Sequence, residues 1–294
     1  MLTAARVMTA PSATRPLTAG TEPGLQRARG WFGLDVKQRD GRTVMADLVQ
    51  GGCCRLLFPR VETPMLEAVT VNISGGMAGG DRIEGRIGCR AGTQLLVTSQ
   101  AAERVYRARA ADPPSEIDLT CRLEAGACLD WLPHGTLFFD GSVMRRVMRV
   151  DMAATAQFLY LESRIFGRTG SGEIVETLAL RDRLTIRREG RLILEDLLRL
   201  ESKTVSGLLA SKAAGDGAPA NATLILVSPR AEALLTPVRE ALEAGYTGSF
   251  AASAWNGMLV VRGIASGGWA LEKTIRHILP ILRGGRPMPA TWRS

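Results

Sequence analysis

A repeated unit in the middle of the chain restricts the fold more than any other feature of the 294-residue sequence. Each copy contains a segment in which apolar residues alternate with others, a corner of small residues and a second apolar segment, and the corners recur about every 30 residues. The four copies are residues 83–89 with 95–99, 117–123 with 129–132, 143–152 with 158–161, and 180–186 with 192–194. Alternation is the period of a β-strand, and such a repeat indicates stacked units that cannot bury a hydrophobic face alone. The sequence therefore predicts a mainly β fold, either a solenoid-like stack of repeated β units or a layered antiparallel sheet.

The repeats lie within one predicted domain that extends over residues 25–294. Residues 1–24 are rich in Ala, Thr and Pro, a composition typical of a disordered tail. Residues 211–221 combine Gly, Pro and Asp with small residues and predict an exposed loop. Asn256-Gly257 lies between two apolar segments and is typical of the turn of a β-hairpin.

Two helices are predicted in the C-terminal region, at residues 228–245 and 269–282. Ser228, followed by a proline, suits the N-cap of the first helix. Pro237 is expected to kink that helix because proline lacks the N–H that an interior position needs. The second helix carries apolar residues at helical spacing along one face, and Pro280 is expected to kink or end it.

A glycine-rich segment precedes the repeats. Its glycines, and the acid that follows them directly, are Gly75, Gly76, Gly79, Gly80 and Asp81. Glycine is favoured where φ must be positive or where another backbone approaches closely. The segment lacks the terminal Lys-Ser/Thr of a phosphate-binding loop, and no helical pattern follows it, which excludes that kind of nucleotide site. We interpret the segment as a tight opening corner of the stack, in which Asp81 is the side chain able to contact a cation.

Composition limits the classes of partner. Lys+Arg 37 against Asp+Glu 29 gives a net charge of +8, but aromatic residues make up only 5% and the arginines mostly alternate with acids. This pattern favours a solvated, arginine-rich strand face over a nucleic-acid interface. No apolar run is long enough to span a membrane. The 5 cysteines lack the spacing of a disulfide framework or a zinc site, which favours a reducing, cytoplasmic compartment.

Few residues are available for catalysis. The chain has only 2 histidines, so no Ser-His-Asp arrangement can be proposed. Paired carboxylates would support glycoside cleavage in a β-solenoid, and the candidates are Asp81, Asp130, Asp140, Glu162 and Glu173. A carbohydrate-active enzyme therefore stays open as an alternative, although sugar sites usually present more exposed aromatic residues than this segment offers.

Six short motifs follow one another along the chain. They are GGMAGGDR at 75–82, TSQAAERVYR at 98–107, GACLDWLP at 126–133, GRTGSGE at 167–173, SAWNG at 253–257 and GGRPMPATW at 284–292. Together they resemble the signatures of the UreD (UreH) family of urease accessory proteins. The chain departs from the usual family pattern in three places, the first being Ser99 in place of a usual Thr. His134-Gly135 replaces a usual Gln-Glu, so a carboxylate is missing at 135, and Glu103-Arg104 replaces a usual Thr-Lys.

The resemblance implies a non-enzymatic scaffold, a chaperone for metallocentre assembly. It implies binding to the urease apoprotein subunits and to the accessory protein UreF, with the GTPase UreG reached through UreF. It also implies support of nickel delivery to the urease active site. No tightly bound cofactor is expected, and nickel would be only in transit. Neither a nucleic-acid nor a membrane partner is expected.

The residues available for nickel favour transit over storage. Nickel(II) is held tightly by imidazole and thiolate ligands, which this chain cannot gather, whereas scattered carboxylates bind weakly and exchange. Our hypothesis is a polar passage lined by Asp81, Glu162 and Glu173, with Gln100 and Arg168 nearby. The alternative is that these are turn residues and ion pairs that support the corners of the repeats. Tyr106 and His134 are expected to face partner proteins.

Overall fold

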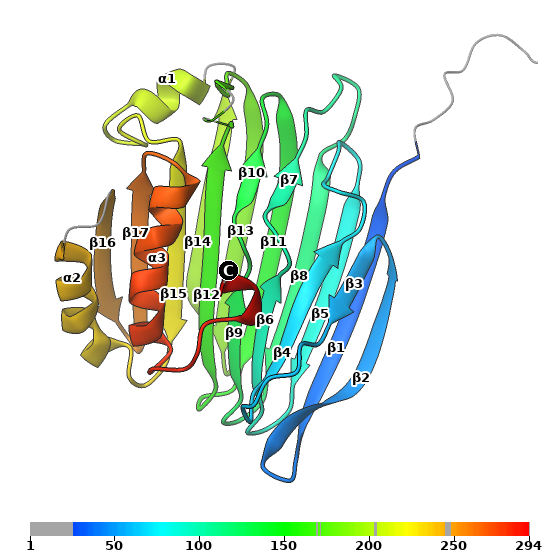
Figure 1. The fold of residues 1–294 in the computed structure, drawn as a ribbon, viewed down its shortest axis with the longest axis vertical. Helices are drawn as coiled ribbons and strands as arrows, with labels where there is room; N and C mark the ends of the chain where they lie inside the picture. Colours follow the sequence, from blue (N-terminus) through cyan, green and yellow to red (C-terminus); the bar gives the residue numbers. More distant parts are fainter. Residues whose placement is uncertain (1–25, 169, 171, 203–204, 245–247, 294) are drawn as a thin grey trace, which may run out of the picture.

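The computed structural model describes residues 26–293 apart from 169, 171, 203–204 and 245–247. The predicted tail at 1–24 and the predicted end of the first helix at Gly245 therefore lie outside the described residues. In the described part, two β-sheets face each other, and the two longer helices lie together on the outside of one of them (Figure 1).

The first sheet, sheet A, contains seven strands. They are β1 (Arg29–Arg39), β2 (Arg42–Gly52), β5 (Arg82–Cys89), β8 (Ser115–Leu123), β11 (Ser142–Met152), β13 (Leu178–Arg188) and β14 (Arg191–Ser202). Their order across the sheet is β14-β13-β11-β8-β5-β1-β2. The five central strands of sheet A run parallel to one another, and only β2 and β14 at the two edges are antiparallel to their neighbours.

The second sheet, sheet B, contains ten strands. They are β3 (Cys54–Leu57), β4 (Leu66–Asn72), β6 (Gln94–Ser99), β7 (Glu103–Val105), β9 (Cys128–Leu132), β10 (Thr136–Phe138), β12 (Gln157–Phe166), β15 (Ala220–Val227), β16 (Ser249–Trp255) and β17 (Met258–Ala265). The main order is β16-β17-β15-β12-β9-β6-β4-β3, and the short strand β10 joins β7 to β12.

The first three copies of the repeat cross from one sheet to the other at their corners. The chain passes from β5 to β6, from β8 to β9 and from β11 to β12, and successive strands within each sheet pair in parallel. The corners also contact one another: the Gly92 N–H donates to the Ala125 carbonyl and the Gly126 N–H to the Thr155 hydroxyl, both at 2.9 Å. The mainly β prediction is confirmed, and the layered antiparallel alternative is wrong for these strands.

The fourth copy differs from the other three. Strands β13 and β14 pair antiparallel and both belong to sheet A. Their connection consists of Glu189 and Gly190, with φ of 49° and 74°. Two residues with positive φ form the tight turn that suits a hairpin, whereas the four-residue corners of the earlier copies carry the chain across to sheet B. The fourth repeat is therefore a hairpin within one sheet.

Strands β11 and β12 show why the two halves of a repeat have different sequences. In β11, Met144 and Met148 are buried between the sheets, whereas Arg145 and Arg149 are exposed on the outer face of sheet A. In β12, every residue from 158 to 164 is buried. Its second face is covered by helix α3, and residues 158–161 form the apolar run expected of a strand covered on both sides, followed by the buried polar residues Glu162, Ser163 and Arg164.

The outer face of sheet A carries ion pairs between neighbouring strands. Arg149 of β11 contacts Asp118 of β8 at 2.7 Å, and Arg183 of β13 contacts Glu195 of β14 at 2.7 Å. This arrangement agrees with the arginine-rich strand face that the sequence predicts. Such exposed pairs contribute little to stability individually.

Helix α3 (Gly268–Leu282) confirms the second predicted helix. Its apolar residues Leu271, Ile275, Ile278 and Leu282 are buried, and the helix packs on β12, β15 and β17. Pro280 lies in the last turn and the helix ends two residues later. The predicted hairpin is also confirmed, because Asn256 and Gly257 join β16 to β17 with φ of 50° and 72°.

The first predicted helix begins later than expected. A 3₁₀ turn, η2 (Glu232–Leu234), leads into α2 (Leu235–Glu243). Ser228 instead follows β15, and its N–H donates to the Gly257 carbonyl at 3.0 Å. Pro237 falls in the first turn of α2, where an N–H has no intrahelical partner, so the interior position assumed for it was wrong.

Two further short elements were not predicted. Helix α1 (Val205–Ala210) precedes the predicted loop, which is mostly exposed until β15 begins. A 3₁₀ turn, η3 (Ala290–Trp292), lies in the C-terminal segment that follows α3. This segment crosses the outside of sheet B, where the Ala290 N–H donates to Glu67 of β4 at 2.7 Å (Figure 1).

Candidate functional site

A cavity of about 260 Å³ lies between the two sheets. One end is bounded by exposed loop residues that include Gly75, Gln100 and Ala101. The far wall is apolar and comes mainly from sheet A, with Phe32 and Met148 among its residues. The cavity therefore has a polar mouth in the loops of sheet B and reaches into the core.

Four charged side chains lie between the sheets at the inner end of this cavity. Arg146 of β11 and Glu162 of β12 line the cavity, and Asp182 and Arg164 lie behind them. Arg146 donates to Glu162 at 2.7 Å, and its Nε donates to Asp182 at 2.9 Å. Arg164 Nε donates to Asp182 at 2.8 Å. All four residues are at most 6% exposed, so this cluster joins sheet A to sheet B inside the core.

The two carboxylates of the cluster are held differently. Burial raises the pKa of Glu162, and the nearby guanidinium of Arg146 offsets this only in part. Burial also acts on Asp182, but Arg146 and Arg164 outweigh it and hold the pKa of Asp182 well below its usual range. Asp182 is therefore the firmly ionised partner, and Glu162 is the weaker one.

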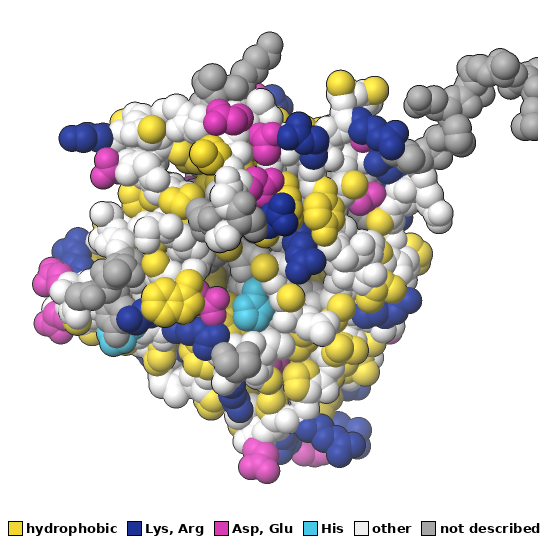
Figure 2. All heavy atoms as spheres, turned by 45° about the horizontal axis from the view of Figure 1, so that its top comes forward, with side chains coloured by type: hydrophobic (Ala, Val, Ile, Leu, Met, Phe, Trp, Pro, Cys, Tyr) yellow, Lys and Arg dark blue, Asp and Glu magenta, His cyan; other side chains and the backbone are white. Residues whose placement is uncertain are grey.

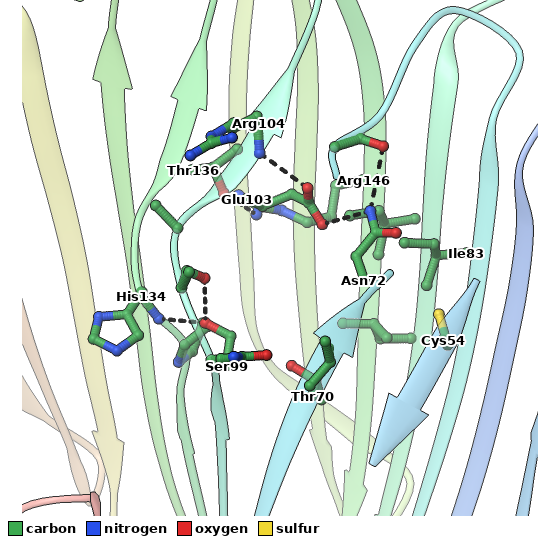
Figure 3. Close-up of a pocket in the computed structure, with 18 of the residues that line it drawn as sticks. Cys54, Thr70, Asn72, Ile83, Ser99, Glu103, Arg104, His134, Thr136 and Arg146 are labelled. Carbon is green, nitrogen blue, oxygen red and sulfur yellow. Dashed lines mark hydrogen bonds between the residues drawn. The ribbon is translucent and has the colours of Figure 1, made fainter. Parts of the chain in front are cut away.

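A further carboxylate, Glu103, lies at the mouth. One oxygen accepts from Asn72 Nδ2 at 3.1 Å and the other from the Arg104 N–H at 2.9 Å (Figure 3). Burial raises the pKa of Glu103. Strand β7 places Glu103 beside Thr136 of β10, and the Thr136 hydroxyl donates to Glu162 at 3.1 Å. One threonine therefore separates the mouth carboxylate from the inner one.

The structure brings only some of the predicted site residues to this cavity. Those that line it are Gly75, Gly76, Gln100, His134 and Glu162. The remaining predicted residues, Asp81, Glu173, Arg168, Gly79, Gly80 and Tyr106, lie outside its lining. Of the three carboxylates proposed for the passage, the cavity therefore contains Glu162 alone.

Asp81 holds the glycine-rich corner closed. Its carboxylate accepts from the Ala28 N–H at 2.8 Å and from the Ala78 N–H at 2.7 Å, and the residue is 7% exposed. Gly79 is needed here because a Cβ at that position would lie 2.7 Å from the Cβ of Asp112. These contacts are of the kind that the corner-supporting alternative requires, and both carboxylate oxygens of Asp81 already accept a backbone N–H.

Arg168 and Glu173 form a separate group at the surface. Arg168 donates to Glu173 at 3.0 Å and lies over the ring of Phe139 at 4.9 Å. The Tyr106 ring is 5.1 Å from the same Phe139 ring, and its hydroxyl donates to the Gly75 carbonyl at 2.8 Å. Figure 2 turns this end of the molecule forward and shows charged side chains interleaved with hydrophobic ones.

His134 lies between the cavity and the C-terminal segment. Its backbone N–H donates to the Ser99 hydroxyl at 2.9 Å, and its ring stacks on Trp292 at 4.9 Å. Trp292 in turn donates from Nε1 to the Thr98 hydroxyl at 3.1 Å. Burial lowers the pKa of His134. The C-terminal segment thus helps to form the wall beside the cavity mouth.

Sequence reasoning missed Arg146 and passed over Glu103. A signal for Arg146 exists in β11, where two arginines are adjacent: neighbouring side chains on a strand point to opposite faces, so one of the two arginines has to point into the core. Glu103 was noted only as a departure from the usual family pattern. Nothing local in the sequence indicates that it lies beside Thr136, because that contact is made by two separate strands.

The described residues contain no group of three or more His, Cys, Asp or Glu side chains placed to hold a metal ion. Cys54 lines the cavity, and burial, followed by the neighbouring Cys53, raises the pKa of its thiol to about 12. In the part of the chain with assigned structure, no helix has the length and apolar character to cross a membrane.

The family model described as UreD urease accessory protein matches residues 28–293. A relative named Urease accessory protein UreD from Rhizobium leguminosarum bv. trifolii is 41% identical over 274 residues, which cover 93% of this chain and 97% of the relative. A protein of the same name from Dinoroseobacter shibae is 39% identical over 277 residues, covering 94% of this chain and 96% of the relative. A third, from Agrobacterium fabrum, is 39% identical over 269 residues, covering 91% and 92%.

Proposed function

Because the chain belongs to the UreD family of urease accessory proteins, we propose that it is a scaffold for urease maturation. Members of this family are non-catalytic maturation factors, so the carbohydrate-active alternative is wrong. In this proposal the chain binds the urease apoprotein subunits and UreF, reaches UreG through UreF, and supports nickel delivery to the urease active site. The match over residues 28–293 is the observation that carries the proposal.

The cavity between the sheets supports a polar passage for nickel in transit. Its mouth carries Glu103 and Gln100, and its inner end carries Glu162. Carboxylate and amide oxygens bind nickel(II) more weakly than imidazole or thiolate, which suits exchange. We assign Asp81 and Glu173 to the support of the corners, because each is already bonded to a neighbouring turn.

Two further aspects belong to the same proposal. We interpret the parallel strands of the two sheets as a short solenoid-like stack, a rigid body on which partners can assemble. The five cysteines of the described residues are free thiols, and four of them are buried, which supports a reducing, cytoplasmic compartment. Tyr106 and His134 lie near the cavity mouth and stay candidates for partner contact.

Co-expression with the urease subunits and UreF tests the scaffold. Size-exclusion chromatography should show this chain eluting with urease and UreF, and urease activity should depend on its presence. Failure to form this complex would contradict the scaffold function. The passage is tested separately with Glu162→Gln and Glu103→Gln in the same complex.

Both variants should form the complex but reduce urease activity and nickel content, and together they should act more strongly than either alone. Glu84→Gln is the matched control, because Glu84 is an exposed glutamate on the outer face of sheet A with 57% side-chain exposure. A double variant that assembles normally and activates urease fully would contradict the passage while leaving the scaffold intact.

A further inference from the structure

Two arginines are among the described residues that line the cavity, Arg146 and Arg104. Arg104 is exposed at the mouth, whereas Arg146 is buried and faces the cavity from within the core. Arg146 stands on β11 of sheet A and reaches Glu162 on β12 of sheet B, so its side chain spans the space between the sheets. Figure 3 shows it behind Glu103 and Thr136. A guanidinium therefore already occupies the position that an incoming cation would take.

Charge within the cluster is balanced. Two guanidinium groups, Arg146 and Arg164, neutralise two carboxylates, Glu162 and Asp182. All four lie in the core, where charges interact far more strongly than in water. A divalent cation entering this end would meet Arg146 at short range with no uncommitted carboxylate in the cluster to balance it. The cluster as arranged therefore offers a divalent cation no uncompensated negative charge to bind.

The contacts of Arg146 are unequal, which decides how the cluster would open. Arg146 makes a bidentate contact with Asp182, in which two guanidinium nitrogens donate at 2.9 and 2.5 Å, but it contacts Glu162 through one nitrogen, at 2.7 Å. A two-point guanidinium–carboxylate fork is stronger and more rigid than a single contact. Asp182 also keeps Arg164 as a second partner. The contact with Glu162 is therefore the one that can break while the rest of the cluster stays paired.

Release of Glu162 would leave two carboxylates facing the cavity. Glu162 would keep only the Thr136 hydroxyl, and Glu103 is bonded only to neutral donors, the Asn72 amide and a backbone N–H. Oxygen ligands of this kind accept a divalent cation weakly and reversibly. The structure shows the arrangement with Arg146 on Glu162, and breaking that one contact would give an arrangement in which Glu162 is free to bind a cation.

We propose that Arg146 is a built-in cation that closes the inner end of the cavity, so that divalent metal binds there only when Arg146 has released Glu162. This inference rests on the proposed nickel passage and adds a specificity-determining residue to it. It concerns metal affinity of the chain itself, whereas the scaffold function concerns assembly with urease. The two can therefore fail independently.

Nickel binding to the purified full-length chain tests the proposal. Arg146→Gln removes the built-in cation, and it is expected to fold because Arg164 still neutralises Asp182. Isothermal titration with nickel chloride at neutral pH should show affinity roughly tenfold higher than wild type, a change of about 1.4 kcal/mol. The matched control is Arg145→Gln, the same substitution one residue earlier, where the side chain lies on the outer face and pairs with Glu116 at 3.2 Å.

The double variant Arg146→Gln/Glu162→Gln should lose the gain, because the freed carboxylate is then absent. Circular dichroism and gel filtration establish that each variant is folded. If Arg146→Gln does not fold, Arg146→Lys carries the test, since one ammonium cannot contact both carboxylates and affinity should rise by a smaller factor. The proposal is overturned if folded variants at Arg146 bind nickel no better than Arg145→Gln, or if the gain persists without Glu162.

Discussion

Alanine substitutions at the adjacent residues Gly75 and Gly76 separate two reasons for needing glycine. Gly75 has a φ of 79°, and a Cβ there would meet no atom within 4 Å. Gly76 has a φ of 143°, and a Cβ there would lie 2.5 Å from the Tyr106 ring and 2.9 Å from the Arg104 carbonyl oxygen. Gly75 is therefore constrained by backbone conformation alone, and Gly76 by conformation together with close approach.

The expected losses follow from these distances. A left-handed conformation costs a residue with a side chain about 1–2 kcal/mol, which is the full effect expected for Gly75→Ala. Gly76→Ala adds overpacking of about 1–3 kcal/mol, for a total of about 2–5 kcal/mol. The Arg104 carbonyl cannot move away freely, because it accepts the Met77 N–H at 2.7 Å. Gly76→Val should be worse still and should disrupt folding or assembly with partners.

Urea unfolding followed by circular dichroism measures the difference. Both variants should unfold at lower urea than wild type with an unchanged slope, and Gly76→Ala should shift the midpoint clearly more than Gly75→Ala. Equal shifts would mean that the overlap with Tyr106 and Arg104 is relieved at no cost. A soluble Gly76→Val variant with wild-type stability would refute the account of this corner.

The remaining predictions concern two carboxylates. Asp130 is fully buried and contacts Arg283 Nε at 2.9 Å. Asp130→Ala should therefore lower the free energy of unfolding by about 3–5 kcal/mol, because it leaves a buried guanidinium without this partner, whereas Asp130→Leu combined with Arg283→Met should recover most of that loss. A double variant no more stable than Asp130→Ala would contradict this. Burial raises the pKa of Glu103 above its ordinary 4.5, so the folded chain holds that proton more tightly than the unfolded chain does. The resulting stability is present below the unfolded pKa and is lost as pH rises through the folded pKa. The unfolding free energy of wild type relative to Glu103→Gln should therefore fall as pH rises from about 4 to 7, and a constant or rising difference in chemical denaturation would refute the assignment.

The fourth repeat shows where local pattern stops being informative. Its alternating strands and its glycine-containing connection resemble those of the earlier copies, and both strands form as predicted. Whether the chain crosses to the other sheet or returns within the same one depends on the length and φ angles of the connection. The same holds for Pro237, whose effect depends on where the helix begins.

The strands and their corners were determined by the sequence itself, because alternation, apolar runs and glycine positions are local properties. Strand β11 carries exposed arginines because one face meets solvent, and residues 158–161 of β12 form an apolar run because both faces of that strand are covered. The sequence motifs also identified the family, whose model matches residues 28–293. These features need only neighbouring residues to be recognised.

Only the tertiary structure decided which charged groups meet. Asp81, Glu162 and Glu173 are equally plausible in the sequence, but Asp81 closes a turn and Glu162 lies in the core opposite Arg146. Glu103 and Thr136 become neighbours through the pairing of β7 with β10. Such contacts join strands that are far apart in the chain, and they depend on how the strands pair within each sheet and on how the two sheets face each other. No local pattern records that registration, so the cavity and its charge balance exist only in the folded molecule.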